Sequence, residues 1–221
     1  AAWAQCPNGT PPPCRAQPAA QADSLLSQAR AAILRAQRGD RDGAKREFQT
    51  FIDVYNTRAD RLTSQEFVAV AVAVTYLGVD DPQLFKDALR AYDRAIATDP
   101  DNLDARVKLG ELFLEKYNGA EAKTTLAGAL ARNPAYVPAL VAEAKRRDFD
   151  NERGADSLLN RALALEPEHV PGRVLHARFL ADIEDFAGAM REVDRALRAK
   201  PDDVDALALA SALARVTGDT A

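Results

Sequence analysis

Apolar residues recur along most of this chain at a helical spacing, in stripes that predict short helices joined in pairs. The clearest pair lies between residues 106 and 134. One face of its first helix carries Arg106, Leu109, Gly110 and Phe113, at offsets typical of a helix. The facing stripe of its second helix carries Ala122, Leu126 and Ala129. The turn residues Tyr117-Asn118-Gly119 separate the two helices. Pro134 ends the second one, because the residue before a proline is pushed out of the α region.

The alanine stripe of the second helix recurs. Its leading alanines are Ala44, Ala88, Ala122, Ala155 and Ala189, at intervals of 44, 34, 33 and 34 residues. Twelve residues after each of them stands Asn56, Pro100, Pro134, Pro167 or Pro201. Glycine precedes three of the alanines, at Gly43, Gly154 and Gly188, where we expect it to permit close approach of two helix backbones. The series predicts five helical hairpins in a row.

This pattern resembles the tetratricopeptide repeat, whose signature is Trp-x2-Leu-Gly-x2-Tyr, Ala-x3-Phe and Pro at a period of 34 residues. The resemblance covers residues 24–217, although no repeat has the tryptophan and Arg106 stands in its place in the clearest unit. It implies an all-α fold, a right-handed superhelical solenoid of about five hairpins plus a terminal helix. We expect that solenoid over residues 20–221, after a proline-rich arm over residues 1–19.

Local signals refine the expected helices. Asp23 or Ser24 is suited to cap the first helix, and Gly39-Asp40 to form the turn that follows it. Residues 67–74 alternate valine and alanine as a strand would, but the flanking repeats favour a helix that is buried on nearly all sides. The loop of the second unit is stretched, from Gly78 to Pro82.

Both cysteines lie in the arm, in the sequence Cys6-Pro-Asn-Gly-Thr-Pro-Pro-Pro-Cys14. Its turn signal and its stiff triple proline favour a disulfide between Cys6 and Cys14, which requires an oxidising compartment. Two free thiols are the alternative. A metal pair is disfavoured because the chain has no other cysteine and no histidine nearby. The nine residues also resemble a Cys-Pro-rich element of extracytoplasmic segments in bacterial proteins.

Two further features of the arm point outside the cytoplasm. The first is Ala2-Trp3-Ala4, which looks like the small-x-small end of a signal peptide. The only methionine of the sequence is Met190, so we expect that the N-terminus has been processed. Asn8-Gly9-Thr10 is an N-glycosylation sequon, with Thr10 as an O-glycosylation alternative, although turn chemistry explains the same residues. We therefore expect a bacterial extracytoplasmic protein that is secreted, periplasmic or at the cell surface.

Composition narrows the function. The 29 basic and 33 acidic residues leave a net charge of −4, which argues against a nucleic-acid partner held by counterion release. The sequence has no apolar run long enough for a membrane-spanning segment. It has no nucleophile motif, phosphate loop or metal-spaced ligand set, so we expect no enzyme, metal or cofactor. A closed cavity with two acids of shifted pKa would revive an enzymatic reading.

A binding or structural protein remains. The resemblance places the first helices of the repeats on a concave groove, with Val107, Glu111, Leu114, Ala144, Arg147, Val174, Arg178 and Ala181 facing a protein partner. Nearby, Lys145-Arg146-Arg147 end a helix, where basic residues usually stay solvated and complement the helix dipole. Alternatively, they read a carboxylate on a peptide tail.

The favoured use is head-to-tail self-association into an extracellular filament. Residues 204–216 predict a terminal helix that is apolar on almost every side, whereas a capping helix normally has a polar outer face. Tryptophan is a common interface anchor. The predicted contact residues are Trp3, Leu207, Leu209, Leu213 and Val216. The alternative is a monomeric secreted or periplasmic scaffold that binds a different protein or peptide in its groove.

Overall fold

The structure, a computed structural model, describes residues 18–78 and 82–218. These residues form eleven α-helices, one short 3-10 helix and no strand, which confirms the all-α prediction for the described chain. The predictions for Trp3, Cys6, Asn8, Thr10 and Cys14 fall outside the described residues. The helices are α1 (Pro18–Gln37), α2 (Arg41–Arg58), α3 (Ser64–Leu77), α4 (Pro82–Thr98), α5 (Leu103–Glu115), α6 (Gly119–Arg132), α7 (Val137–Phe149), α8 (Ala155–Leu165), α9 (Val170–Asp182), α10 (Phe186–Ala199) and α11 (Val204–Thr217).

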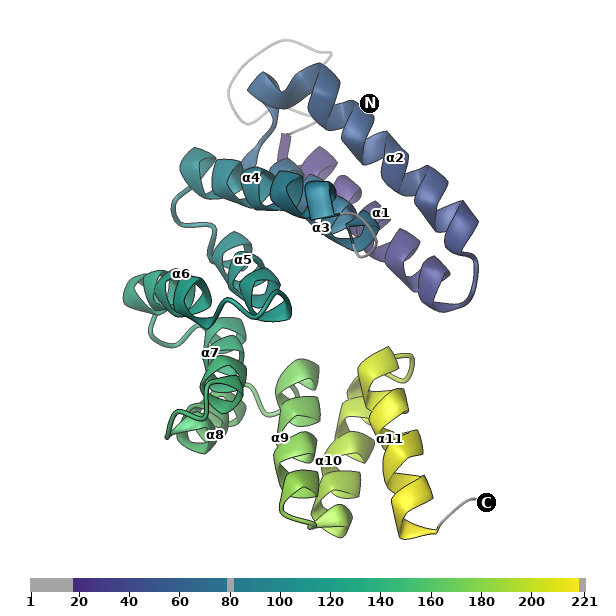
Figure 1. Ribbon diagram of the computed structural model, residues 1–221, viewed down its shortest axis with the longest axis vertical. Coiled ribbons are helices and arrows are strands. Elements are labelled where there is room, and N and C mark those ends of the chain that lie inside the picture. Colours follow the sequence, from purple (N-terminus) through teal and green to yellow (C-terminus); the bar gives the residue numbers. More distant parts are fainter. Residues whose placement is uncertain (1–17, 79–81, 219–221) are drawn as a thin grey trace, which may run out of the picture. The chain divides into compact units, whose positions relative to one another are not determined.

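Ten of the helices pair into five hairpins, and α11 follows as a terminal helix (Figure 1), as the repeat pattern predicts. The chain divides into two compact units, Ala1–Ala105 and Arg106–Ala221. In the first unit, α3 packs on α1 and α2 as well as on its own partner α4. In the second unit, α9 packs on α7, α8 and α10, and α11 packs on α9 and α10. Within each of the two units, a hairpin therefore packs against the first helix of the next hairpin, which is solenoid packing. The right-handed superhelix stays a prediction.

The alanine stripe forms the seam of each hairpin. Among the leading alanines, Ala44, Ala88, Ala122 and Ala189 are completely buried. Ala155 is half-buried because it is the first residue of α8. The large residue four positions later is buried in every unit: Phe48, Tyr92, Leu126, Leu159 and Val193. The residue three positions further is buried too: Phe51, Ala95, Ala129, Ala162 and Ala196. Phe51 thus fits the core although the other four units have alanine there.

Helix ends differ from the sequence prediction at two places. Helix α1 already begins at Pro18, so Asp23 and Ser24 lie inside it and do not cap it. Helix α2 continues past Asn56 to Arg58 and then into the 3-10 helix Ala59–Arg61. The reason is chemical: asparagine keeps the backbone N–H that proline lacks, so a helix passes through it.

The turns that follow α1, α5, α7 and α9 use a positive backbone φ at a regular place, the second residue after the helix. Gly39 takes φ +103, and Tyr117, Asn151 and Glu184 take values of 53 to 62. In the clearest unit the left-handed residue is therefore Tyr117, and the glycine of that turn already begins α6. Asn118 caps α6, since its side chain accepts a hydrogen bond from the backbone N–H of Glu121.

The glycines before the leading alanines have a different use from the one predicted. The N–H groups of Gly43 and Gly188 donate to the carboxylates of Asp40 and Asp185, at 2.9 Å and 2.8 Å. A Cβ atom on either glycine would collide with that capping carboxylate. Gly154 is itself the N-cap of α8, with φ +90. The close approach is thus between a helix N-terminus and its cap, not between two helix backbones.

The strand-like valine and alanine run is helical, as predicted. Residues 67–74 lie in α3, whose start is fixed by a capping box between Thr63 and Glu66. The N–H of Glu66 donates to the Thr63 hydroxyl, and the Glu66 carboxylate accepts from the N–H of Thr63 at 2.8 Å. Alternation of two apolar residue types is compatible with either period, so burial on several sides of α3 decides for the helix.

Helices α5 and α6 meet at Gly110. A Cβ atom placed there would lie 2.8 Å from the side chain of Leu126, which is completely buried. Gly128 offers a contrast within the same unit, because a Cβ atom there would meet its nearest neighbour, Arg106 Nη1, at an ordinary 3.4 Å. The hairpin therefore needs the missing side chain at residue 110 and not at residue 128.

We expect Gly110→Ala to lower the free energy of unfolding by about 1–3 kcal/mol, because overpacking at Leu126 outweighs a gain of about 1 kcal/mol in helix propensity. Gly128→Ala is the matched control and should raise the same quantity by up to about 1 kcal/mol. Urea unfolding followed by far-UV circular dichroism measures both. Equal stability of the two variants would contradict the close contact.

Candidate functional site

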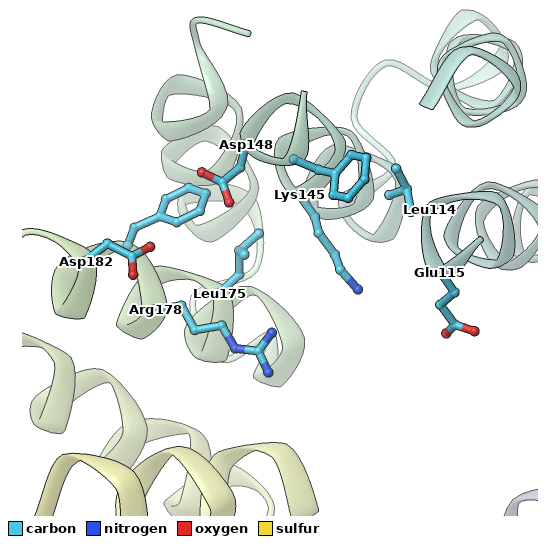
Figure 2. Close-up of a pocket in the computed structure, with 9 residues that line it drawn as sticks. Leu114, Glu115, Lys145, Asp148, Leu175, Arg178 and Asp182 are labelled. Atoms are coloured by element: carbon cyan, nitrogen blue, oxygen red, sulfur yellow. The ribbon is translucent and has the colours of Figure 1, made fainter. Parts of the chain in front are cut away.

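The first helices of three consecutive hairpins, α5, α7 and α9, line a hollow with a volume of about 310 Å³ (Figure 2). Helix α5 contributes its C-terminal end, and α7 and α9 contribute their C-terminal halves. The lining residues are Leu114, Glu115, Lys145, Asp148, Phe149, Leu175, Arg178, Phe179 and Asp182. A floor of apolar side chains with charges of both signs around it suits a peptide better than a small apolar ligand.

The charges of the hollow are separated by sign. In Figure 2 the charged ends of Lys145 and Arg178 point toward the same open region, and the carboxylates of Asp148 and Asp182 lie on the other side of Leu175. Burial raises the pKa of Asp148, and the nearby negative charge of Asp182 raises it further. Partial burial raises the pKa of Glu115, against the opposing effect of the Lys145 charge. Burial is therefore the main cause of both raised pKa values, and the negative charge of Asp182 adds to it at Asp148.

The hollow can be compared with the closed, acid-lined cavity that an enzyme would require. Glu115 and Asp148 both line the hollow, but both residues are exposed to solvent. The hollow is therefore not the closed cavity that this reading requires. In the described part of the chain, no group of three or more His, Cys, Asp or Glu side chains is placed to hold a metal ion. No described helix has both the length and the apolar character to span a membrane.

The predicted groove residues lie close to the hollow, and two of them line it, Leu114 and Arg178. Val107, Ala144 and Val174 are buried, with exposures of 4%, 0% and 5%, and do not line the hollow, whereas Leu114 lines it although it is only 5% exposed. Glu111, Arg147 and Ala181 are half-buried and do not line the hollow. On α7 and α9 the lining side chains stand one position further along, at Lys145, Leu175 and Asp182. A sequence signal for Lys145 exists, because it stands one repeat length of 33 residues before the predicted groove residue Arg178.

Arg146 contradicts the expectation that Lys145-Arg146-Arg147 stay solvated. Its side chain is completely buried and donates to the carboxylates of Glu143, Asp150 and Glu152, at 2.8, 2.6 and 2.7 Å. Arg147 also bonds Glu143, at 3.0 Å. Burial alone would raise the pKa of Glu143, but the hydrogen bonds from the two arginines outweigh it and hold that pKa below its usual value. Of the three basic residues, Lys145 alone lines the hollow.

The Arg146 cluster also links neighbouring hairpins. Glu152 accepts from Arg146 on α7 and from Lys123 on α6, the latter at 3.0 Å, so it joins two consecutive hairpins. Its pKa falls to about 2, because the hydrogen bonds from Arg146 and Lys123 favour the ionised carboxylate. Arg173 on α9 is a second buried arginine, which donates to the carbonyl of Pro167 at 2.6 Å and to Glu192.

The terminal helix α11 buries one face and exposes another. Leu213 is 3% exposed and packs in a core cluster with Ala177 and Val193, so in the folded chain it is not available for a contact with a second molecule. Leu209 is half-buried against the same cluster. Leu207 and Val216 are exposed, by 44% and 63%.

The sequence matches a known family over part of its length. Residues 83–145 match the tetratricopeptide repeat. No curated protein matches the chain. The match covers α4 from its second residue, the hairpin of α5 and α6, and residues 137–145 of α7. It supports the tetratricopeptide assignment that the alanine and proline series predicts.

Solved structures show the same tetratricopeptide fold at low sequence identity. A thermophilic tetratricopeptide repeat protein of Thermus thermophilus is similar at a TM-score of 0.63 and 20% identity, over 86% of this chain and 98% of that one. PilW, described as a widely conserved type IV pilus biogenesis factor, is similar at a TM-score of 0.56 and 19% identity, over 89% and 87% of the two chains. PilF of Pseudomonas aeruginosa gives 0.52 and 18%, over 90% and 87%. At these identities the likeness establishes the fold.

We expect Arg146→Met to lower the free energy of unfolding by about 3–5 kcal/mol, because it leaves the buried Glu143 carboxylate without its main partner. Arg147→Met is the control and should cost about 1 kcal/mol or less, since Arg147 is 34% exposed and forms a single ion pair. The double change Glu143→Leu with Arg146→Met should recover part of the loss. Chemical unfolding measures all three. A loss at Arg146 no larger than that at Arg147 would contradict the buried cluster.

A pH dependence follows from Glu152. Its pKa is lowered to about 2 in the folded chain, so its stabilising effect is fully present above its ordinary unfolded pKa of about 4.3 and is lost as the pH falls through the folded value. We expect wild type to be more stable than Glu152→Gln at pH 6 and this difference to shrink steadily toward pH 2. Thermal unfolding across that range measures it. A difference independent of pH would show that Glu152 acts without its charge.

Proposed function

We propose that this tetratricopeptide-type scaffold binds a short extended segment of another protein in the hollow of α5, α7 and α9. One observation carries the proposal. Lys145 and Arg178 both line the hollow together with apolar residues, their charged ends point toward the same open region, and in the described chain neither forms an ion pair. Charged side chains that are held beside apolar surface without a partner are suited to hydrogen bonding with an incoming peptide.

The apolar floor supports the same use. Leu114, Leu175 and Phe179 line the hollow. Leu114 and Leu175 are only 5% and 7% exposed, so the half-buried Phe179 and Phe149, which is 43% exposed, present most of the apolar surface. Such side chains supply the desolvated centre of an interface, and the charged residues around them supply orientation. A hollow of about 310 Å³ holds a few side chains of a peptide and not a folded domain.

We expect the paired change Lys145→Glu and Arg178→Glu to weaken peptide binding about tenfold or more, because it reverses the charge on one side of the hollow. Peptides selected from a random display library on the wild-type chain are the probes, and fluorescence polarisation measures their affinities.

Arg161→Glu with Arg191→Glu is the matched control, since these arginines are exposed on α8 and α10 and do not line the hollow. Selected peptides that bind both double variants equally well would move the binding site elsewhere.

Head-to-tail self-association is a second candidate, and the exposed apolar side chains of α11 favour it. Leu207 and Val216 are exposed, and a surface of this kind is suited to packing against a second copy of the chain. This candidate includes the extracellular filament and the extracytoplasmic location that the Cys6–Cys14 segment predicts. Resistance of both cysteines to alkylation before reduction, in protein from its natural source, would support that location.

We expect Leu207→Asp and Val216→Asp to shift any concentration-dependent assembly toward monomer, because each places a charge in an apolar contact. Leu165→Asp is the control, since Leu165 is similarly exposed at the end of α8. Sedimentation velocity over a wide concentration range measures the assembly. A wild-type chain that stays monomeric throughout would rule this candidate out.

A further inference from the structure

We propose that the hollow selects an extended segment with an apolar, an acidic and an arginine side chain at every second position, in that order. The inference rests on the proposed function of peptide binding in this hollow. It goes beyond that function because it assigns a chemistry and an order to the bound segment.

The first argument is the order of side chains along α9. Leu175, Arg178 and Asp182 line the hollow from three successive helical turns, as an apolar residue, a cation and an anion. Helix α7 repeats the charged part of this order with Lys145 and then Asp148. The two helices pack against each other. They therefore present one shared polarity, with positive charge toward the helix N-termini and negative charge toward the C-termini.

The second argument is spacing. Successive turns of a helix place side chains about 5 Å apart along the axis. In an extended peptide, residues two positions apart point to the same side and lie about 6.8 Å apart. Over three positions the mismatch is about 3 Å, which the long side chains of Lys145 and Arg178 can absorb. A segment that lies along α7 and α9 thus sets three alternate side chains against the three levels of the hollow.

The third argument is that the fold itself does not use these charges. Within one helix, an acid placed before a base stabilises better than the reverse order, and here Lys145 precedes Asp148 and Arg178 precedes Asp182. Both acids also stand at the C-terminal ends of their helices, where the helix dipole disfavours negative charge. Among the described residues, none of the four takes part in an ion pair, although the charge of Lys145 acts on Glu115 at the α5 end of the hollow. A bound acid beside the two cations and a bound base beside the two anions would satisfy all four.

The fourth argument selects arginine as the basic residue. Phe149 directly follows Asp148 in the sequence and is 43% exposed at the hollow. The Tyr117 ring lies 5.7 Å from the Phe149 ring and is 82% exposed. A guanidinium pairs with a carboxylate and stacks on an aromatic face at the same time, which an ammonium group does less well. Because Phe149 and Asp148 both line the hollow, a bound arginine can pair with the carboxylate and reach the aromatic face, which favours arginine over lysine.

A wholly acidic segment is the main competitor, because Lys145 and Arg178 would attract it. It would place its second acid beside Asp148 and Asp182, where the negative charge already raises the pKa of Asp148. Repulsion there opposes the attraction at the cations, so the mixed order is the better fit.

The test uses the full chain and synthetic nine-residue probes that are acetylated and amidated, so that no terminal charge contributes. Their central residues are Leu-Ser-Asp-Ser-Arg, the exchanged Leu-Ser-Arg-Ser-Asp, the wholly acidic Leu-Ser-Asp-Ser-Asp and the lysine form Leu-Ser-Asp-Ser-Lys. Isothermal titration measures each affinity. We expect the first probe to bind about fivefold or more tightly than the exchanged and acidic probes, the size of effect that a few partly exposed ion pairs give. The lysine form should fall between them.

A charge-swapped variant sharpens the test: Lys145→Asp and Arg178→Asp combined with Asp148→Lys and Asp182→Lys. All four residues are exposed, and circular dichroism checks that the variant keeps its helices. It should prefer the exchanged probe. Phe149→Leu should remove the preference for arginine over lysine and leave the preference for charge order.

The outcomes separate the two proposals. Equal or tighter binding of the acidic or exchanged probe to wild type overturns the charge order, but the proposed function stands if Phe179→Ala weakens all probes alike. No binding of any probe at millimolar concentration overturns the inference, whereas the library selection with the Lys145→Glu and Arg178→Glu variant judges the proposed function on its own.

Discussion

The alanine seam of each second helix is the constraint on which the rest of the structure depends. At Ala44, Ala88, Ala122 and Ala189 the side chains are completely buried, and only a small residue allows the first helix to approach that closely. The close approach sets the rotation of each first helix, and this rotation decides which side chains face the core and which face the hollow. A scaffold of this kind therefore fixes its binding surface through its smallest residues.

Much of this architecture can be predicted from sequence, because it depends on spacing. The series from Ala44 to Ala189 gives the hairpins, and prolines from Pro100 to Pro201 give the ends of their second helices. The exact rotation of a helix is harder to predict, since neighbouring positions differ by about 100° and a stripe of apolar residues spans a similar angle. The repeat pattern consequently assigns Ala144 and Val174 to the groove, whereas the neighbouring Lys145 and Leu175 line it.

Side-chain pairing is the part that local patterns describe least well. Arg146 looks like its neighbours Lys145 and Arg147 in sequence, yet it is completely buried because Glu143, Asp150 and Glu152 surround it. The spacing of Glu143 and Arg146 does allow an ion pair on one helix, but Glu152 comes from the following turn, whose position depends on the fold. The positive φ of Tyr117 is equally hard to predict. Asn118 and Gly119 predict that a turn lies here, but they do not predict that Tyr117 is the residue that adopts the left-handed conformation.

The Glu152 carboxylate has a consequence for how the chain opens. In a linear repeat protein each unit contacts its neighbours alone, so stability divides into a contribution from every hairpin and one from every junction. Glu152 follows α7, where it bonds Arg146 of its own hairpin, and it also reaches Lys123 on α6, so it strengthens a junction as well as a hairpin. When the contact between neighbouring hairpins is strong, the hairpins unfold together as one cooperative block. When it is weak, they unfold one at a time from the ends. Helix α7 carries both Arg146, which bonds Glu152, and Lys145, which lines the hollow, so loss of structure at this junction would also disrupt the hollow.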